Sequence, residues 1–152
     1  MSAFVTAGAG FLLAVLWFDL MFDVQVLPHR GHRNDLPEDV LASISGYYRR
    51  VTTAARPMNR LVGAVMLATT VAIVVQIADG DAPAWTGWAS LVLAASAIGL
   101  AAVHTFPSAV RLGARVDSLA VQSGLARSIC RDHLLCVTAI TSLMVIQLAF
   151  TG

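Results

Sequence analysis

The sequence contains no lysine, so all ten basic side chains in its 152 residues are arginines. Charged residues of both signs make up only 12% of the chain, against roughly 25% in typical soluble proteins. Hydrophobic residues make up 57%, and the mean hydropathy is +0.74. So little charge and so much apolar surface exclude an ordinary water-soluble domain, and the composition predicts an integral membrane protein.

The first ten residues, MSAFVTAGAG, lack any positive charge. The apolar run that follows is longer than the apolar region of a usual signal peptide and contains two acids. We therefore expect this segment to be retained as a membrane helix. The net charge of +1 gives no reason to expect a nucleic-acid partner.

Cysteine is scarce, with only Cys130 and Cys136 present. Six helical residues would place these two side chains about 240° apart, and both lie at the expected cytoplasmic end of a helix, in a reducing compartment. We expect no disulfide between them. The sequence also lacks a Walker loop, a glycine-rich dinucleotide turn, a serine nucleophile elbow and an HExxH zinc motif.

Four apolar segments are long enough to cross the roughly 30 Å hydrocarbon core at about 1.5 Å per residue. They run approximately over Thr6–Val26, Leu61–Ala78, Trp88–His104 and His133–Phe150. The predicted fold is an all-α integral membrane protein, a bundle of four transmembrane helices forming a single domain over residues 1–152. Its first partner is the lipid bilayer.

The arginines fall in two places, six between Arg30 and Arg60 and four between Arg111 and Arg131. The N-terminal tail, the turn Asp79–Trp85 and the C-terminus have none. By the positive-inside rule, both arginine-rich loops are expected in the cytoplasm and both termini outside. This pattern predicts a multi-pass protein of a bacterial-type cytoplasmic membrane.

Each arginine-rich loop has the pattern of an amphipathic helix. The first is predicted over about Leu36–Arg56, opened by Asp35 as N-cap and ended by Pro57. The second is predicted over Ser108–Cys130. Both helices are expected to lie on the cytoplasmic face of the membrane.

A duplicated helical hairpin is also predicted, with halves at about residues 1–80 and 81–152. Each half would contain a membrane helix, an amphipathic helix and a second membrane helix. A shift of 71 residues aligns identical residues in the two halves, among them Trp17 and Trp88, Arg56 and Arg127, Arg60 and Arg131, Thr70 and Thr141, Gln76 and Gln147, Ala78 and Ala149.

Two aspartates lie within the first apolar segment. Asp19 and Asp23 are four residues apart, so on a helix they lie about 40° apart on one face. An aspartate near the centre of a membrane helix costs roughly 2.5 to 3.5 kcal/mol, so both are expected to face the bundle interior. Asp23 is predicted to pair with Arg60 or to act as a ligand or proton carrier.

Helices of alternating direction would gather polar residues from all four segments in one layer toward the cytoplasmic side. The predicted layer contains Asp19, Asp23, Asn59, Arg60, His104, Asp132 and His133. The predicted layout of the chain resembles small four-helix bacterial membrane proteins, including cytochrome b-type anchors, in architecture and not in motif.

We favour a haem- or metal-binding membrane redox protein as the function of this layer. His104 and His133 would clamp a haem iron or, with Asp23, a transition metal, because imidazoles from neighbouring helices suit both. Arg60 and Arg131 would then meet haem propionates or another anionic group. If the protein is an enzyme, it is expected to be an oxidoreductase with Asp19 and Asp23 as its catalytic carboxylates.

Two alternatives stay open. The layer can serve as a proton or ion relay in a small carrier. Otherwise Asp19 or Asp23 pairs with Arg60 in a non-catalytic accessory or anchor subunit of a membrane complex or homo-oligomer. The pair His29 and His32 is interpreted as part of a solvated basic loop, with a metal pair as the alternative.

Overall fold

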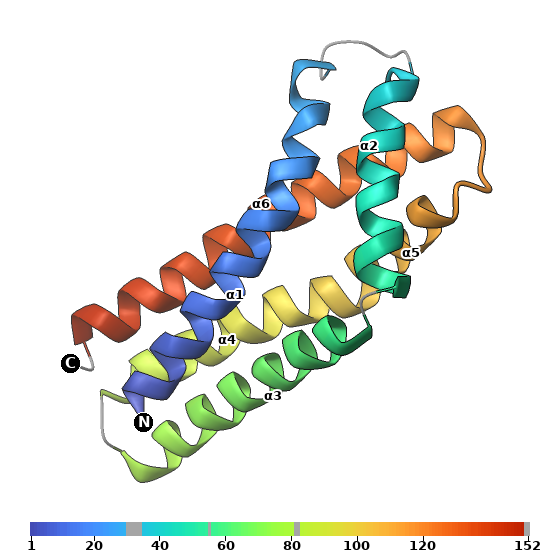
Figure 1. The fold of residues 1–152 in the computed structure, drawn as a ribbon. Helices are drawn as coiled ribbons and strands as arrows, with labels where there is room; N and C mark the ends of the chain where they lie inside the picture. The colour runs from blue at the N-terminus through green and yellow to red at the C-terminus, as the bar shows by residue number, and fades with distance from the viewer. Residues whose placement is uncertain (30–34, 55, 81–82, 151–152) are drawn as a thin grey trace.

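The computed structural model of the chain describes residues 1–29, 35–54, 56–80 and 83–150. These residues form helices and no strand, as Figure 1 shows. Four helical stretches are long and apolar enough to cross a membrane, namely Ser2–His29, Pro57–Asp79, Ala84–Ala114 and Leu119–Phe150. The prediction of an all-α protein with four membrane-spanning helices is confirmed.

The membrane stretches contain short irregular turns as well as α-helices. The elements are α1 (Ser2–Asp23), a 3-10 turn η1 (Val24–His29), α2 (Glu38–Arg49), a π-turn η2 (Arg50–Ala54), α3 (Arg56–Asp79), α4 (Ala84–Leu100), a π-turn η3 (Ala101–Thr105), α5 (Phe106–Ala114) and α6 (Leu119–Phe150).

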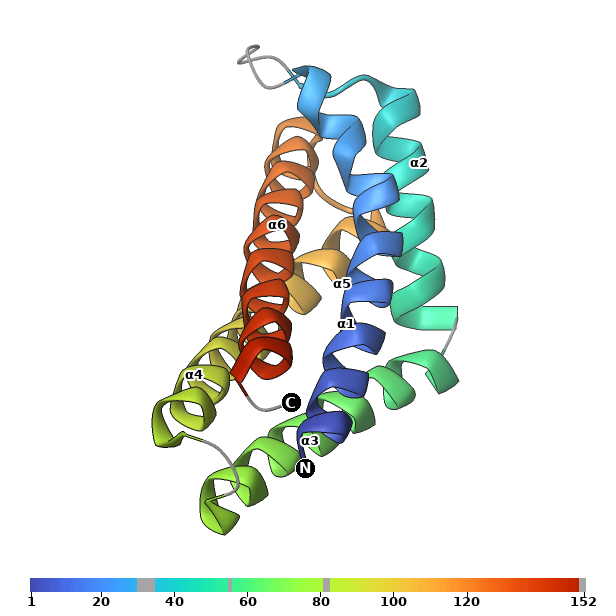
Figure 2. The same ribbon diagram turned by 90° about the vertical axis from the view of Figure 1, so that its left-hand side faces the viewer.

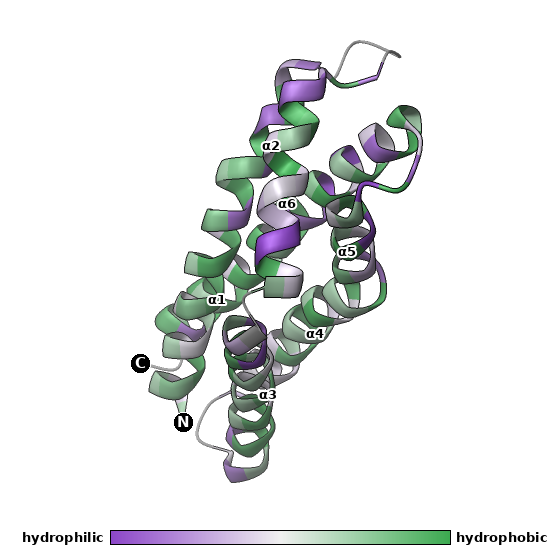
Figure 3. Cartoon of the chain, turned by 45° about the vertical axis from the view of Figure 1, so that its right-hand side comes forward, coloured by the Kyte–Doolittle hydropathy of each residue, from purple (hydrophilic) through white to green (hydrophobic). Residues whose placement is uncertain are grey.

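In the bundle, α1 packs on α3 and α6, and α4 packs on α3 and α6 (Figures 1 and 2). The start of α1, the end of α3, the start of α4 and the end of α6 lie at one end of the bundle, which we call the terminal end. Helices α2 and α5 pack on each other at the opposite end, which we call the arginine-bearing end. Hydrophilic residues gather on α2, on α5 and at the start of α6, whereas the long helices are mostly hydrophobic (Figure 3).

Two groups of buried apolar residues hold these parts together. The first joins the four long helices and consists of Val5, Ala9, Leu12, Ala72, Ile73, Ala94, Ala97, Cys136, Ile140 and Leu143. The second joins α2 and α5 to the first half of α6 and consists of Val26, Leu36, Leu41, Ile44, Tyr48, Ala109, Leu112, Ala126, Ile129 and Cys130. Many large apolar side chains face outward, among them Phe4 and Val103, as lipid-facing positions require.

One glycine allows α2 and α5 to approach closely. A Cβ atom at Gly113 would lie 2.8 Å from the backbone nitrogen of Arg49 and 3.0 Å from its Cα. Because backbone atoms cannot rotate away as a flexible side chain can, any larger residue at this position would push the two helices apart. The helix that carries both tyrosines therefore owes its position partly to Gly113.

The second amphipathic segment differs from the prediction in its boundaries. Helix α5 ends at Ala114, and Arg115 takes a left-handed conformation with φ of 56°. Helix α6 then begins at Leu119 and continues without a break to Phe150. The predicted range Ser108–Cys130 is thus divided between two helices, because an ordinary L-residue, without a glycine or proline to mark it, occupies the C-cap.

The duplicated hairpin stays a prediction. Shifted by 71 residues, the end of α3 at Asp79 coincides with the end of α6 at Phe150. One matched pair is in contact, with Gln76 Nε2 donating to Gln147 Oε1 at 3.2 Å. Another pair occupies unlike positions, since Trp17 lies in the last two turns of α1 and Trp88 in the first two turns of α4.

Candidate functional site

Asp23 is completely buried at the C-terminal end of α1, and both of its carboxylate oxygens have a partner. Oδ2 lies 2.6 Å from Nδ1 of His133, on α6. Oδ1 accepts a hydrogen bond of 2.6 Å from the hydroxyl of Tyr48, on α2. Three helices therefore meet at this one carboxylate, which meets the requirement that a buried charge be paired and hydrogen-bonded.

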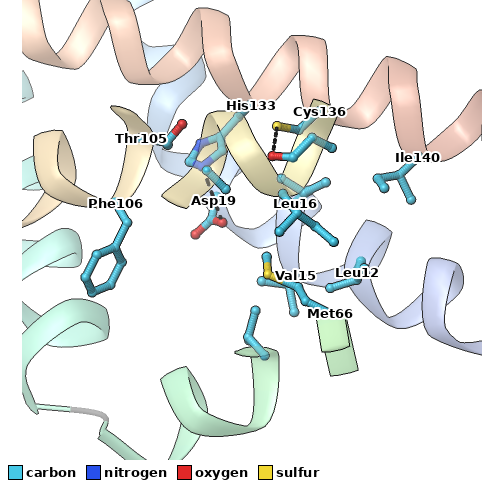
Figure 4. Close-up of a pocket in the computed structure, with 14 residues that line it drawn as sticks. Leu12, Val15, Leu16, Asp19, Met66, Thr105, Phe106, His133, Cys136 and Ile140 are labelled. Carbon is cyan, nitrogen blue, oxygen red and sulfur yellow. Dashed lines mark hydrogen bonds and ion pairs between the residues drawn. The ribbon is translucent and has the colours of Figure 1, made fainter. Parts of the chain in front are cut away.

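Asp19, one helical turn earlier on α1, repeats this arrangement with a longer contact to the histidine. Its Oδ1 accepts a hydrogen bond of 2.6 Å from the hydroxyl of Tyr47. Its Oδ2 lies 3.8 Å from Nε2 of His133, the contact drawn in Figure 4. The imidazole of His133 is thus held between two carboxylates. We call Asp19, Asp23, Tyr47, Tyr48 and His133 the buried cluster.

Two local spacings produce this cluster. The four-residue interval in α1 stacks the two carboxylates on one face, as predicted. The adjacent tyrosines on α2 point toward successive carboxylates, and Tyr47 also stacks on Phe22 with ring centroids 4.1 Å apart. Burial, together with the charges of Asp19 and Asp23, raises the pKa of both tyrosines well above the ordinary value. Both hydroxyls therefore stay protonated and act as donors.

A cavity of about 140 Å³ lies beside Asp19 and His133, as Figure 4 shows. Asp19, His133 and Thr105 contribute its charged and hydroxyl groups. The rest of its lining is aliphatic, aromatic or sulfur-containing and consists of Leu12, Val15, Leu16, Val62, Met66, Ala97, Ile98, Ala101, Phe106, Cys136 and Ile140. An apolar cavity of about 150 Å³ can hold one benzene ring, so this space suits a small ligand.

A second cavity, of about 280 Å³, shares part of this lining, including Asp19, Met66 and His133. It extends past Tyr47 to Asn59 at the arginine-bearing end of α3. Among the described residues that line the two cavities, none is an arginine. The buried cluster is therefore bordered by apolar, aromatic and neutral polar groups on its open side.

A separate polar group forms on another face of α6. Asp132 is buried, and its Oδ2 lies 2.5 Å from Nδ1 of His104 and accepts a hydrogen bond of 3.1 Å from Thr105. His104 and Thr105 both belong to the π-turn η3, which departs from regular α-helix at this level. The His104 side chain is 46% exposed, so this pair reaches the surface, whereas Asp23 and His133 are both buried.

The expected ion pair between Asp23 and Arg60 does not form, and that prediction is wrong. Tyr48 and His133 occupy both oxygens of Asp23, and the Arg60 side chain is exposed. Asn59 donates instead to the backbone oxygen of Thr52 at 3.1 Å. The predicted single layer is divided in two, because neighbouring residues of α6 face different helices.

The two histidines predicted to share a cofactor have separate carboxylate partners, Asp132 for His104 and Asp23 for His133. Over residues 1–29, 35–54, 56–80 and 83–150, no three His, Cys, Asp or Glu side chains are grouped so that they could hold a metal ion. Nη2 of Arg131 lies 3.7 Å from Oδ1 of Asp132, the next residue in the chain. The haem and metal assignments of these residues stay predictions.

His29 lies in η1, whereas His32 is outside the described residues, so the interpretation of that pair is not decided. Sequence reasoning did not predict a role for Tyr47 and Tyr48, which lie within the predicted amphipathic helix Leu36–Arg56. A usable sign existed: the two tyrosines of the chain are adjacent and follow a segment with two membrane aspartates.

A third buried polar group lies toward the terminal end. Gln147 of α6 donates to the hydroxyl of Ser90 at 2.9 Å and accepts from Gln76 of α3 at 3.2 Å. All three side chains are buried. This group is separated from the buried cluster along α6 by the apolar core residues Cys136, Ile140 and Leu143.

No protein-family model, curated protein or solved structure matches the chain. Its function is therefore inferred from the geometry of the buried cluster and the two cavities beside it.

Proposed function

We propose that the protein is a small proton-coupled carrier in which the buried cluster takes up and releases the proton. The observation that supports this is the position of His133, whose imidazole lies between the carboxylates of Asp19 and Asp23 inside a membrane bundle. Ionisable groups within membrane helices commonly mark proton relays and substrate pathways. Imidazole is suited to such a relay because one ring nitrogen can accept a proton while the other releases one.

The charges of the cluster favour proton binding. Two carboxylates surround one imidazole, so even with His133 protonated the cluster keeps one net negative charge until a further proton or cation arrives. Like charges repel strongly at the low effective dielectric of a protein interior. A proton that binds to the cluster should reduce this repulsion. Proton uptake should therefore be coupled to any movement that changes the distance between α1 and α6.

Polar groups lie on both sides of the buried cluster along the bundle. Asp19 borders the larger cavity, which extends toward the arginine-bearing end at Asn59. Toward the terminal end, Gln76, Ser90 and Gln147 form a separate buried polar group, divided from the buried cluster by the apolar core residues Cys136, Ile140 and Leu143. The cavities beside Asp19 support a carrier more than they support a subunit in which the carboxylates only fix helix register.

We also infer that the arginine-bearing end faces the cytoplasm of a bacterial-type membrane, since arginine-rich loops are retained there. Reporter fusions test this orientation. A reporter active only in the cytoplasm should function when inserted at Gly46 or Gly124 and stay silent when fused after Gly152. The opposite pattern would reverse the proposed orientation.

The carrier itself is tested in proteoliposomes that contain a pH-sensitive dye, with the membrane potential clamped by potassium and valinomycin. We expect the wild-type protein to dissipate an imposed pH gradient faster than empty vesicles, and the Asp23→Asn variant to behave like empty vesicles. The matched control is Asp79→Asn, at the exposed end of α3, which should equal the wild type. A wild-type rate equal to that of empty vesicles would contradict the proposal.

The same purified sample distinguishes the redox alternative. A Soret band, or a stoichiometric metal, that is present in the wild type and lost in His104→Ala or His133→Ala would replace the carrier with a cofactor-binding protein. A folded protein with neither cofactor nor proton movement would indicate an accessory or anchor subunit.

A further inference from the structure

The two carboxylates of the buried cluster differ in whether a ligand in the cavities could reach them. Asp23 is fully buried, and both of its oxygens have hydrogen-bond partners at 2.6 Å. Asp19 lines both cavities, and its Oδ2 comes no closer to His133 than 3.8 Å. Asp19 is therefore the carboxylate that can meet a ligand, whereas Asp23 holds the imidazole in place.

The walls around Asp19 have the chemistry that recognises organic cations. Tyr47 and Phe106 border the larger cavity with aromatic rings, and Met66 contributes a polarisable thioether. Aliphatic side chains supply most of the remaining surface. A ligand with a diffuse positive charge and an apolar body would contact all of these groups, whereas an anion would be repelled by Asp19.

We propose that Asp19 binds a small organic monocation in this cavity, and that the cation takes the place of the proton. This inference rests on the proposed carrier function and names its substrate class. When the carboxyl group of Asp19 is protonated, the incoming cation displaces that proton. The O–H bond breaks, the proton leaves to water, and the ammonium centre pairs with the carboxylate without forming a covalent bond. The cluster loses one positive charge with the proton and regains it with the cation, so the total charge of the occupied site is unchanged.

The size of the space limits the ligand. The smaller cavity, of about 140 Å³, has room for about one aromatic ring. The larger cavity, of about 280 Å³, shares Asp19 and extends the room toward Tyr47. A single ring that carries a quaternary ammonium group fits these dimensions, so benzyltrimethylammonium is a suitable probe.

The pH dependence of binding is set by the groups around Asp19. Helix α3 and the α4–η3 stretch contribute no titratable side chain among the described cavity-lining residues. The titratable neighbours are Asp23 from α1, Tyr47 and Tyr48 from α2, and Asp132, His133 and Cys136 from α6. Protonation of either a carboxylate or His133 makes the cluster more positive, so acid weakens cation binding in every case.

The experiment measures binding of benzyltrimethylammonium to the full chain in lipid nanodiscs by calorimetry, together with proton release in weakly buffered solution. We expect about one proton released per cation bound, and an affinity that falls about tenfold per pH unit on the acid side. Asp19→Asn should abolish binding and proton release, while Asp79→Asn leaves both unchanged. Val62→Phe, which would narrow both cavities, should lower the affinity for the probe at least tenfold.

Two results would overturn the inference. One is equal affinity for neopentylbenzene, the uncharged carbon analogue of the probe, because the cavity would then select shape alone. The other is cation binding that persists in Asp19→Asn with unchanged pH dependence. Gradient dissipation without cation binding would reject the substrate class and leave the carrier intact. Cation binding with proton release but no gradient dissipation would reject the carrier and leave the cation site.

Discussion

Tyr48 donates its hydroxyl proton to Asp23 across 2.6 Å and so links the surface helix α2 to the membrane helix α1. The same hydroxyl lies 3.5 Å from Nδ1 of His133. A residue of an amphipathic helix therefore completes a site inside the bundle. Removing that one oxygen atom tests how far the site depends on α2.

We expect Tyr48→Phe to lower the free energy of unfolding by about 1–3 kcal/mol, because it leaves a buried carboxylate with one partner fewer. Thermal unfolding in detergent measures the loss. Tyr47→Phe is the comparison, and its effect should be smaller because both Tyr47 and Asp19 are only partly buried. Equal stability of Tyr48→Phe and the wild type would show that the hydroxyl is not an essential partner of Asp23.

The ionisation of tyrosine reports on the buried cluster alone, since the chain has only two tyrosines and both belong to it. Burial and the neighbouring carboxylates raise the pKa of both in the folded state, whereas unfolded tyrosine ionises near pH 10. The unfolded chain therefore loses protons first, and stability should fall as the pH rises above about 10. Below that pH the contribution of the tyrosines is fully present.

Phenolate absorbance measures this directly. The folded protein should show little phenolate at a pH where the denatured protein shows two full equivalents. The Tyr47→Phe variant should halve the signal of the denatured chain. A folded protein that titrates near pH 10 would mean that the two hydroxyls are not held by the carboxylates.

Gly113→Ala should destabilise the protein by about 1–3 kcal/mol, because its new Cβ would press on the backbone of Arg49. Gly46→Ala is the matched control, since it lies in the partner helix α2 and its Cβ would meet nothing within 4 Å. That control should be neutral or stabilising by up to about 1 kcal/mol, because alanine favours helix over glycine. Similar losses in both variants would contradict the close approach of α2 and α5.

Double-mutant cycles distinguish the partners of Asp23. Asp23→Asn and His133→Gln should show a coupling energy of about 0.5–3 kcal/mol, as expected for residues in contact. Asp23→Asn and Arg60→Gln should show none beyond about 0.3–0.5 kcal/mol, because the Arg60 side chain is exposed and does not pair with Asp23. Strong coupling to Arg60 would restore the ion pair predicted from the sequence.

The features predicted well from the sequence are those that depend on local periodicity. Hydropathy alone located the four membrane helices, and the four-residue spacing of Asp19 and Asp23 placed both on one buried face. Such features need only the geometry of a single helix. They do not depend on how the helices cross.

The partners of those side chains depend on tertiary packing and could not be predicted. Nothing in the sequence distinguishes Tyr48 from Arg60 as the neighbour of Asp23, because both residues lie toward the same end of the bundle. Arg115 takes its left-handed conformation without the usual glycine, so the end of α5 carries no mark in the sequence.

Asp132 and His133 are consecutive residues of one uninterrupted helix, and consecutive side chains on an α-helix point about 100° apart. One contacts His104 near the surface, and the other contacts Asp23 in the interior. Because both side chains are short, neither can follow its partner far if α6 turns about its axis. A rotation of α6 would therefore lengthen both contacts at the same time. In this way α6 couples the contact near the surface mechanically to the contact in the interior.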